Sequence, residues 1–548
     1  MEREVVAALE LEDGGGGGGD GDGDGELEQR LRAFNRQNSQ TFNFDLKEQE
    51  ERKKLCEEVL KALQKDQRRS CQATCLETIR ILSRDKKVLA PLTTRPGMLL
   101  LMQLAGLECT QSSAPHASHS DVIIEALKCL CNMVFNSEMA QQLSVDLKLV
   151  IGICERLKKH RDKKLVHGIK FFDLRLLFLL SALRVDARTQ LKEDLQGLLL
   201  LTDVLESTLD IKWSDKYVVA RNDSSAPLSE EQVDFAIETL KALFNVTYDC
   251  SQQKVVEQDQ VHQFRYLTAI LCHCLLLRAE AEGKTEEFYS HTINLLNNIP
   301  VSSLDLLFSP TIEFGVIDYN GKKMDTVEVL LAFMEKRIDR GTNLKEGLTP
   351  VLSVLTECSR THKDMRKYIR SRVLPPLKDV KNRPEVGTTL RNKLVRLMTH
   401  IDTGVKHMAA EFLFVLCKES VDCLLKYTGY GNAAGLLAAH GLLAGGRGNG
   451  MYSEDEDTDT EEYKSVKSSI NPITGHMEDP MPNPMAGMTE EQKEYEAMKL
   501  VNMFDKLSRE QIIKPMRVKP DGTMGPLEEA ADEYASDRDS TSHSDQEG

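Results

Sequence analysis

A stripe of apolar residues at helical spacing recurs along this chain, and each time it ends near a polar side chain. The stretch EALKCLCNMVFN at 125–136 has a near copy, ETLKALFNVTYD, at 238–249. Its apolar residues fall three and four positions apart, which predicts amphipathic helices. Shorter relatives of the stripe occur at 77–85, 172–180, 292–298, 351–359 and 393–400. The pattern therefore predicts repeated helical units.

The intervals between these stripes predict the architecture. Successive stripes are 42 to 66 residues apart, and no window shows the alternation expected of strands. Armadillo and HEAT units span ~40–47 residues, and polar insertions such as 110–120 and 213–231 account for the longer intervals. Each unit buries its apolar faces only by stacking on its neighbours. We expect an all-α fold, an armadillo/HEAT-repeat right-handed superhelical solenoid, over 27–428.

The chain outside this array has a different composition. Residues 451–548 hold 24 acidic and 10 basic side chains, whereas the central part is mildly basic. Such acidic, Ser-rich segments do not form a core. The expected parts are a disordered Gly/Asp-rich N-terminus (1–26), a small helical segment with a Gly-rich linker (429–450), an acidic phospho-regulatory linker (451–488), an amphipathic helix (489–510) and a disordered acidic tail (511–548).

The helix at 489–510 is the clearest element of the C-terminal third. Thr489 and Gln492 have the spacing of a capping box. The apolar stripe of the helix includes Met498, Val501, Phe504 and Leu507. An amphipathic helix between disordered segments needs a surface to cover its stripe. That surface belongs either to a partner, which we favour, or to the protein's own solenoid.

The asparagines at the ends of the stripes suggest a binding groove. In an armadillo array one helix of each repeat lines a concave face, and an asparagine there both donates and accepts hydrogen bonds. Asn132, Asn245 and Asn297 recur in this position, so we expect them to line the groove. The alternative is that each of them bonds the backbone locally.

Two tracts of opposite charge predict a phosphate-dependent latch. Residues 359–396 carry twelve basic and three acidic side chains, and 453–462 carry seven acidic and no basic ones. Ser453 and Thr458 each have Glu three positions later, as an acid-directed kinase requires. Their phosphates would bind a basic cluster, for which we expect Lys363, Arg366 and Lys367. The alternative is two solvated surfaces that do not meet.

The sequence carries no motif for covalent catalysis, nucleotide binding or metal binding. We expect no metal and no cofactor. Most of the thirteen cysteines lie on apolar stripes, which is typical of buried free thiols in a reducing compartment. No apolar run is long enough to span a bilayer, and the acidic termini disfavour nucleic-acid binding. A cytoplasmic monomer is expected.

Specific blocks of sequence resemble the synembryn family. They include LSRDKKVL, FFDLRLLFLL, RNKLVRLMTHID, KYTGYGNAAGLLA, YSEDEDTDTEEY and EEQKEYEAMKLVNMFDKLSR, spread over 77–509. The stretch 335–360 is more similar to synembryn-B than to synembryn-A. The resemblance implies a chaperone and receptor-independent exchange factor for heterotrimeric G-protein alpha subunits (Gα), with the stimulatory and olfactory class suspected. It also implies recruitment to the cell cortex through Gα.

The resemblance assigns roles to individual residues. The C-terminal helix of Gα would lie in the groove, and the helix at 489–510 would contact the Gα switch region. The family's phosphorylated motif matches Ser453 and Thr458. The expected groove residues are Arg80, Arg84, Asn132, Phe172, Arg175, Phe244, Asn245 and Asn297. The runner-up function is an armadillo-repeat adaptor that binds peptides without exchange activity, and an enzyme is the third possibility.

Overall fold

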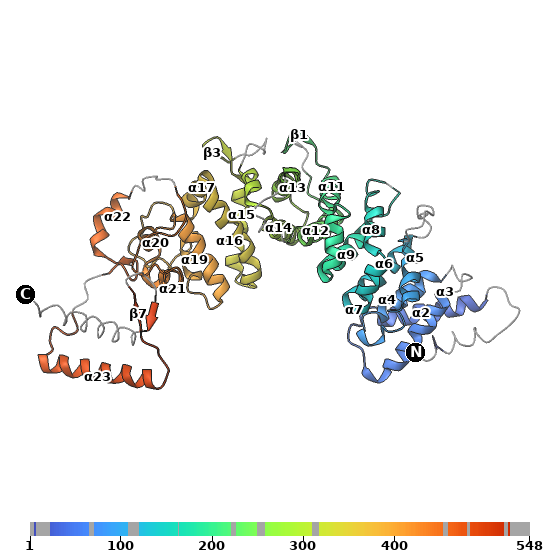
Figure 1. Cartoon of the computed structure of the whole chain (residues 1–548), viewed down its shortest axis with the longest axis horizontal. Coiled ribbons are helices and arrows are strands. Elements are labelled where there is room, and N and C mark those ends of the chain that lie inside the picture. The colour runs from blue at the N-terminus through green and yellow to red at the C-terminus, as the bar shows by residue number, and fades with distance from the viewer. Residues whose placement is uncertain are drawn as a thin grey trace, which may run out of the picture. The chain divides into compact units, whose positions relative to one another are not determined.

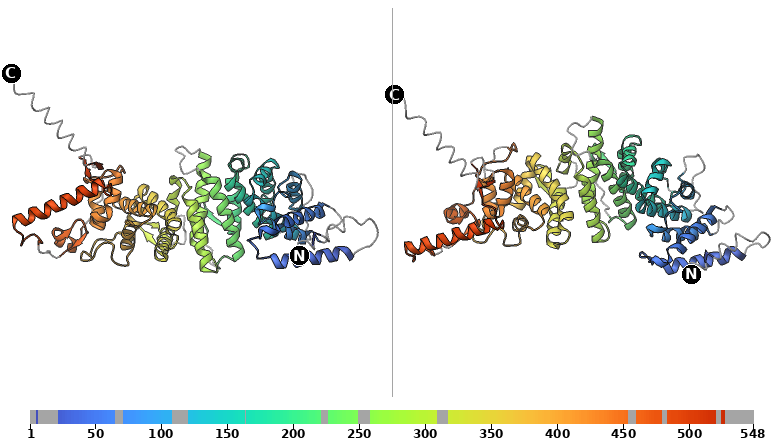
Figure 2. Two further views of the ribbon diagram at one scale, coloured as in Figure 1. Left: turned by 90° about the horizontal axis from the view of Figure 1, so that it is seen from below. Right: turned by 60° about the horizontal axis from the view of Figure 1, so that its bottom comes forward.

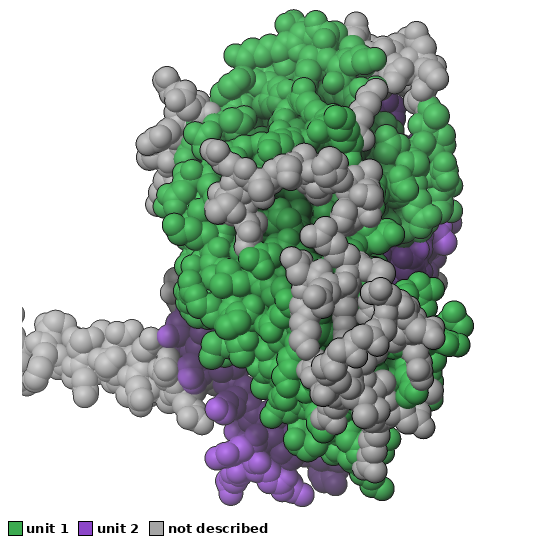
Figure 3. Space-filling model, turned by 90° about the vertical axis from the view of Figure 1, so that its right-hand side faces the viewer, with its two compact units in different colours: residues 1–314 green, residues 315–548 purple. Residues whose placement is uncertain are grey.

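The computed structural model describes residues 5–6, 22–64, 71–107, 120–162, 164–220, 226–248, 258–308, 317–452, 459–478, 483–519 and 524–526. The chain divides into two compact units, Met1–Phe314 and Gly315–Gly548, which Figure 3 colours separately. Helices dominate both units. The strands in the described residues form four two-stranded antiparallel hairpins. The all-α prediction is confirmed.

One row of helices runs through unit 1, each packed against the next (Figure 1). We call it the inner row. Its members are α2 (Asp22–Asn38), α4 (Gln72–Leu82), α6 (Ser120–Asn136), α9 (His167–Leu183), α12 (Glu230–Thr247) and α14 (Glu282–Leu296).

A second set of helices covers the inner row from one side, and Figure 2 shows the pairs from two further directions. Short helices α7 (Glu138–Asp146) and α10 (Val185–Glu193) connect the layers in the manner of armadillo repeats. The covering helices are α3 (Gln49–Gln64), α5 (Arg95–Leu104), α8 (Leu149–Leu157), α11 (Gly197–Thr208) and α13 (Gln258–Leu276), with a hairpin of β1 (Trp213–Asp215) and β2 (Val218–Val219).

Local sequence explains where these helices begin. Ser229 and Gln232 form a capping box at the start of α12, and Thr94 accepts from Gly97 N ahead of α5. The apolar stripes then fill the space between the two layers, with Leu76, Leu130, Leu177 and similar side chains fully buried. The described free cysteines are buried, except for Cys423, which is half-buried. Burial raises the pKa of Cys131 to about 12, so its thiol is inert.

Unit 2 continues the helical pairing and adds hairpins. Its helices are α15 (Asp325–Arg340), α16 (Leu344–Thr361), α17 (Lys363–Val373), α18 (Leu390–Leu397), α19 (Thr403–Leu416), α20 (Val421–Thr428), α21 (Tyr430–His440), α22 (Glu461–Val466) and α23 (Glu490–Arg509). Its hairpins are β3 (Asp318–Tyr319) with β4 (Lys322–Lys323), β5 (Ile470–Asn471) with β6 (His476–Met477), and β7 (Met516–Val518) with β8 (Met524–Pro526).

The β5–β6 hairpin packs closely on the start of α21. Tyr430 N and Gly431 N donate to the carbonyls of Pro472 and Ile473, both at 2.9 Å. Gly429 and Gly475 meet backbone to backbone, and a Cβ on Gly475 would lie 2.9 Å from Gly429 Cα. Both glycines have positive φ, which other residues adopt at a cost. The chain therefore returns to the repeat array after the acidic run.

The predicted domain boundaries stay predictions. Several helices can nevertheless be compared with the parts expected from the sequence. The expected small helix after 429 is α21, and the expected capped helix after 489 is α23. Helix α2 begins at Asp22, inside the segment expected to be disordered. Residues 459–478 of the expected linker hold α22 and the β5–β6 hairpin. Among the described residues, no helix has both the length and the apolar character needed to span a membrane.

Candidate partner-binding face

Charged side chains link the inner helices of unit 1 in a regular way. Arg80 Nε on α4 donates to Glu125 on α6 at 2.7 Å, and Glu125 also accepts from Lys128 at 2.7 Å. The same arrangement recurs between α9 and α12, where Glu238 accepts from Arg175 at 3.1 Å and from Lys241 at 2.9 Å. The repeated Glu-x-x-basic pattern in the sequence therefore forms the contacts between neighbouring repeats.

The repeated asparagines form a second set of contacts between the same helices. Asn132 Nδ2 donates to the carbonyl of Arg80 at 3.0 Å and to Ser83 Oγ at 3.1 Å. Asn245 Nδ2 donates to the carbonyl of Phe178 at 3.1 Å and to Ser181 Oγ at 2.9 Å. Each amide thus holds the last turn of the preceding inner helix.

The third member of this series is Asn298, and the expected register of Asn297 is wrong. Asn298 Nδ2 donates to the carbonyl of Phe244 at 2.9 Å and to Thr247 Oγ1 at 3.2 Å. Asn297 caps α14 and donates to Ile293 O of its own helix at 3.2 Å. The sequence has two adjacent asparagines, at 297 and 298, and either could make the bond to the preceding helix. Their difference of one residue in helical phase decides that Asn298 makes it. Peptide binding by the asparagines stays a prediction.

The contact between α6 and α9 departs from this scheme. In α9 the positions equivalent to Glu125 and Asn132 are held by Phe172 and Leu179. Besides its bond to Glu125 of its own helix, Lys128 Nζ meets no glutamate on α9 but lies 5.4 Å from the centroid of the Phe172 ring. Phe172 also meets Phe171 edge to face, with 5.1 Å between centroids. This contact of Phe172 with α6, which we call the apolar joint, lies in the middle of the expected groove.

Arg84 continues the face beyond the end of α4. Its guanidinium lies 4.5 Å from the centroid of the Phe42 ring and donates to the carbonyls of Ser39 and Thr41 at 2.9 and 3.0 Å. Burial, and then the neighbouring Arg80, lower the pKa of Arg84. These carbonyl contacts fix the cation in place without neutralising it.

The structure brings most of the expected groove residues onto consecutive helices of the inner row. Arg175 is about half exposed, with 48% of its side chain accessible, so it is available to a partner. Asn245 is buried, and Phe244 is half-buried against Tyr248 with 6.2 Å between ring centroids. The residues now joined by direct contacts are Arg80, Glu125, Lys128 and Phe172 on one side, and Arg175, Glu238 and Lys241 on the other.

The expected basic cluster lies at the start of α17 in unit 2. Arg366 is 5% exposed, donates to the carbonyl of Ser359 at 2.8 Å, and lies 4.8 Å from the centroid of the Tyr452 ring. Lys363 is exposed and Lys367 is half-buried. Arg366 therefore has a structural role beside its expected one, because it contacts the residue that directly precedes Ser453.

Both expected phosphorylation sites, Ser453 and Thr458, lie outside the described residues, but the chain on each side of them is held. Tyr452 donates to Glu419 at 2.8 Å, and Gly450 N donates to the same carboxylate at 2.9 Å. Burial raises the pKa of Glu419, but these hydrogen bonds and the neighbouring Arg360 together outweigh burial and hold it below its ordinary value. Tyr452, the last described residue before Ser453, is therefore fixed beside α17.

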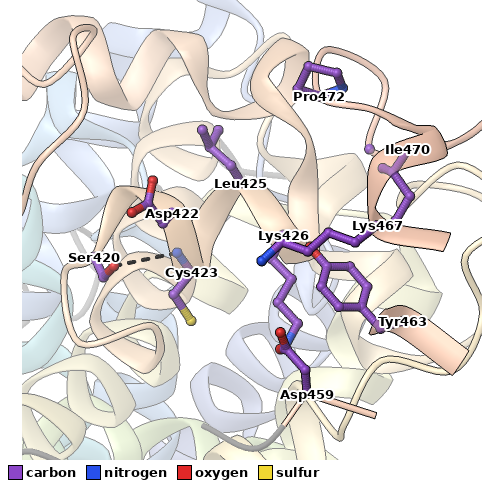
Figure 4. A pocket seen from close by; sticks show the side chains of 11 residues that line it. Ser420, Asp422, Cys423, Leu425, Lys426, Asp459, Tyr463, Lys467, Ile470 and Pro472 are labelled. Carbon is purple, nitrogen blue, oxygen red and sulfur yellow. Dashed lines mark hydrogen bonds and ion pairs between the residues drawn. The ribbon is translucent and has the colours of Figure 1, made fainter. Parts of the chain in front are cut away.

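On the far side, Asp459 and Thr460 are held against α20 and the loop after α17. Lys426 forms an ion pair with Asp459, and the hydrogen bond from Lys426 lowers the pKa of that carboxyl group. Thr460 Oγ1 donates to the carbonyl of Leu377 at 2.5 Å. Figure 4 shows Lys426, Asp459, Tyr463 and Lys467 around a pocket of about 530 Å³ beside α20.

The expected partner-binding helix, α23, leaves its apolar stripe uncovered. None of its residues is buried. Met498, Val501 and Phe504 are 63%, 60% and 59% exposed, and Leu507 is half-buried. The capping box of Thr489 and Gln492 is present as predicted. A stripe of this size in a well-capped helix needs an apolar surface from elsewhere.

Sequence reasoning missed three residues that organise these sites. Asn298 and Glu419 are described above, and Asp173 is fully buried with Arg156 Nε donating to it at 2.7 Å. Asp173 interrupts the most apolar run of the chain, and that interruption was the available signal. Glu419 gave no sequence signal, because its partners lie more than 30 residues away along the chain.

Comparison with known proteins agrees with the resemblance. A family described as "Guanine nucleotide exchange factor synembryn" matches residues 75–523. The chain is 56% identical over 512 residues to "Chaperone Ric-8A" of Gallus gallus, which covers 93% of this chain and 95% of the relative. It is 58% identical over 506 residues to the Ric-8A of Xenopus laevis, covering 92% and 94%.

The expected closeness to the B form is not confirmed. "Chaperone Ric-8B" of Mus musculus is 50% identical over 545 residues, covering 95% of this chain and 97% of the relative, so the two Ric-8A relatives above are more similar. The short stretch 335–360 suggested the opposite. It misled because 26 residues carry little weight against a comparison over about 500 residues. The family assignment itself does not depend on that choice: the chain belongs to the Ric-8, or synembryn, family.

Proposed function

We propose that this protein is a folding chaperone and a receptor-independent guanine nucleotide exchange factor for Gα subunits. The observation that carries the proposal is family membership combined with the inner row of unit 1. The residues expected to bind the Gα C-terminal helix include Arg80 on α4, Arg84 just after it, and Phe172 and Arg175 on α9. Direct contacts through α6 link the two helices. A helical peptide laid across these helices would meet cations and an apolar joint in turn.

The proposed mechanism is selective binding of the nucleotide-free state. The C-terminal helix of Gα supports the loop that contacts the guanine base. A face that binds this helix more tightly when it is detached stabilises the open state, so GDP leaves. The empty Gα exposes apolar surface and would otherwise aggregate. Chaperoning and exchange then share one intermediate, and GTP binding ends both by restoring the closed state.

This mechanism uses binding energy alone and involves no covalent step or cofactor. We propose that the protein acts as a monomer in the cytoplasm and reaches the cell cortex through Gα. The suspected preference for the stimulatory and olfactory class rested on likeness to the B form, so the proposal carries no class preference. α23 is proposed to contact the Gα switch region through Met498, Val501, Phe504 and Leu507.

The latch is the proposed regulation. An acid-directed Ser/Thr kinase would phosphorylate Ser453 and Thr458, and the phosphates would bind Lys363, Arg366 and Lys367. The fixed positions of Tyr452 and Asp459 support this, because the segment between them spans only six residues. Each phosphate would add about −1.5 to −2 charge next to α17.

The deciding experiment measures GDP release from purified Gα of several classes, with and without this protein phosphorylated by an acid-directed kinase. Each Gα is also tested without its last ten or so residues. Release that accelerates only for intact Gα supports the proposal and ranks the classes. If no class shows faster release or a nucleotide-free complex, exchange is excluded. Cell-free Gα synthesis then decides between a chaperone, on which synthesis would still depend, and the peptide-binding adaptor.

A further inference from the structure

The repeated stretches that first identified the inner row contain one more feature. In both NMVF at 132–135 and NVTY at 245–248, an aromatic residue follows the asparagine by three positions. Phe135 is 63% exposed and Tyr248 is 56% exposed. The contacts between repeats use the asparagines and leave the two aromatic side chains at the surface. Burial in the core does not explain why the aromatic recurs.

These two side chains belong to a row across the ends of four inner helices. We call it the end row. Its members are Phe42 and Arg84 beside α4, Phe135 on α6, Leu183 on α9, Tyr248 at the end of α12, and Arg188 of α10, which stacks on Tyr248. Phe42 and Leu183 are 66% and 42% exposed. Arg84 lies just past the end of α4, as Tyr248 lies just past the end of α12.

The inner helices α4, α6, α9 and α12 pack one against the next, and side-chain hydrogen bonds tie two of their ends to neighbouring elements. Asn136 Nδ2 on α6 donates to the carbonyl of Ser83 at 3.1 Å, directly beside Arg84. Arg188 Cζ on α10 lies 5.8 Å from the centroid of the Tyr248 ring, and its Nη1 donates to Ser181 O near the end of α9 at 3.4 Å.

The charge of the end row narrows the choice of partner. Arg84 and Arg188 each stack on an exposed aromatic ring and bond main-chain carbonyls, and among the described residues neither forms an ion pair with a carboxylate. The surface therefore offers apolar area flanked by cations. It suits an apolar polypeptide segment that carries carboxylates.

We infer that the end row is a further client-binding surface, beside the groove and α23, which holds the body of nucleotide-free Gα outside its C-terminal helix. The inference rests on the proposed function and deepens it. A partly unfolded client exposes apolar segments normally buried in its own core, and four exposed apolar side chains in one row match such segments. Continuity favours this occupant, because Arg84 belongs both to the end row and to the expected groove.

The test compares two ligands on matched variants. The end-row variant is Phe135→Ser with Tyr248→Ser, and the control is Leu199→Ser on α11, where the side chain is 50% exposed on a covering helix. One ligand is a peptide of the last twenty or so residues of Gα, and the other is whole nucleotide-free Gα. We expect the end-row variant to bind whole Gα at least about tenfold more weakly and the peptide within about twofold of the unaltered protein.

Three results would overturn the inference. The first is whole-Gα binding within about twofold of the unaltered protein, and the second is an equal loss for peptide and whole Gα, which would assign the row to the helix-binding groove. The third is an equal loss for Leu199→Ser. If the unaltered protein binds neither ligand, the proposed function fails first and this inference falls with it. Unchanged thermal unfolding of the variants, and retained binding by Phe135→Tyr with Tyr248→Phe, separate recognition from misfolding.

Discussion

The side-chain amide of Asn245 donates to the main-chain carbonyl of Phe178, 67 positions earlier in the chain, at 3.1 Å. Through this bond and its bond to Ser181, one asparagine ties α12 to the last turn of α9. Asn132 and Asn298 make the same pair of bonds to α4 and α12. The asparagine at the end of an apolar stripe therefore connects neighbouring repeats, whether or not it also binds a partner.

Replacing Asn245 by Ala should destabilise unit 1 by about 1–3 kcal/mol, because a buried carbonyl and a hydroxyl lose their donor. The measurement is chemical denaturation followed by far-UV circular dichroism. Asn297→Ala is the matched control, since Asn297 Nδ2 donates to the carbonyl of Ile293 within its own helix. Equal losses for the two variants would contradict the role assigned to Asn245.

Replacing Phe504 by Ser should leave the protein's own stability unchanged, because Phe504 is 59% exposed and α23 buries no residue. Affinity for nucleotide-free Gα should fall by about tenfold if the stripe is a binding surface. Calorimetric unfolding and titration with Gα measure the two effects. Lys499→Ser on the same helix serves as the control, and a loss of stability in the Phe504 variant would indicate docking on unit 2 instead.

Ser453→Ala with Thr458→Ala should lower exchange and chaperone activity to the level of the unphosphorylated protein. Lys363→Glu with Lys367→Glu should have the same effect after kinase treatment, because the phosphates would meet repulsion at α17. The readouts are GDP release and the yield of folded Gα in cell-free synthesis. Full activity of either double variant in preparations whose modification state is known by mass spectrometry would remove the latch.

Gly475→Ala should loosen the return of the chain onto α21. An added Cβ would meet Gly429 Cα and Pro384 Cγ, each at 2.9 Å, and φ is +72°. The expected cost is about 1–3 kcal/mol from strain and displacement. Gly435→Ala on α21 is the control, since nothing lies within 4 Å of its added Cβ. Limited proteolysis of 470–477 should accelerate only in the Gly475 variant.

Two half-buried histidines, His273 and His291, should make unit 1 sensitive to mild acid. Burial lowers the pKa of His273 to about 4, and burial together with Lys241 lowers that of His291 to about 4. Because the unfolded chain titrates near 6.5, it binds more protons between pH 6.5 and 4. Stability is therefore complete above about pH 6.5 and declines as pH falls through this window.

At pH 5 each histidine should cost on the order of 1–2 kcal/mol of unfolding free energy. Denaturation midpoints at pH 7.5 and 5 measure the decline. His273→Gln with His291→Gln should flatten it, and an unchanged slope in that variant would assign the acid sensitivity to other groups.

The sequence carried the repeat architecture because a helical period and a recurring interval are local properties. Asn132 and Asn245 were predicted to line the groove, and that role stays a prediction; what the structure shows is their bonds to the preceding inner helix. The error at Asn297 arose because adjacent asparagines differ only in helical phase, which tertiary packing sets. The carbonyl and hydroxyl partners of the asparagines were not predictable, because they belong to another repeat. Glu419 was missed for the same reason.

The apolar joint between α6 and α9 has a consequence for engineering. Contacts made by amide, hydroxyl and carboxylate groups require matched partners on both helices. Exchanging one helix at the α4–α6 or α9–α12 contact therefore needs paired substitutions. At α6–α9, where Phe172 and Leu179 replace Glu and Asn, the contact is mainly apolar, with the Lys128 ammonium over the Phe172 ring and a weak bond from Cys131 Sγ to the Phe172 carbonyl. A designer who wishes to lengthen or splice this array should therefore cut there, and should duplicate α9 and α12 as one block.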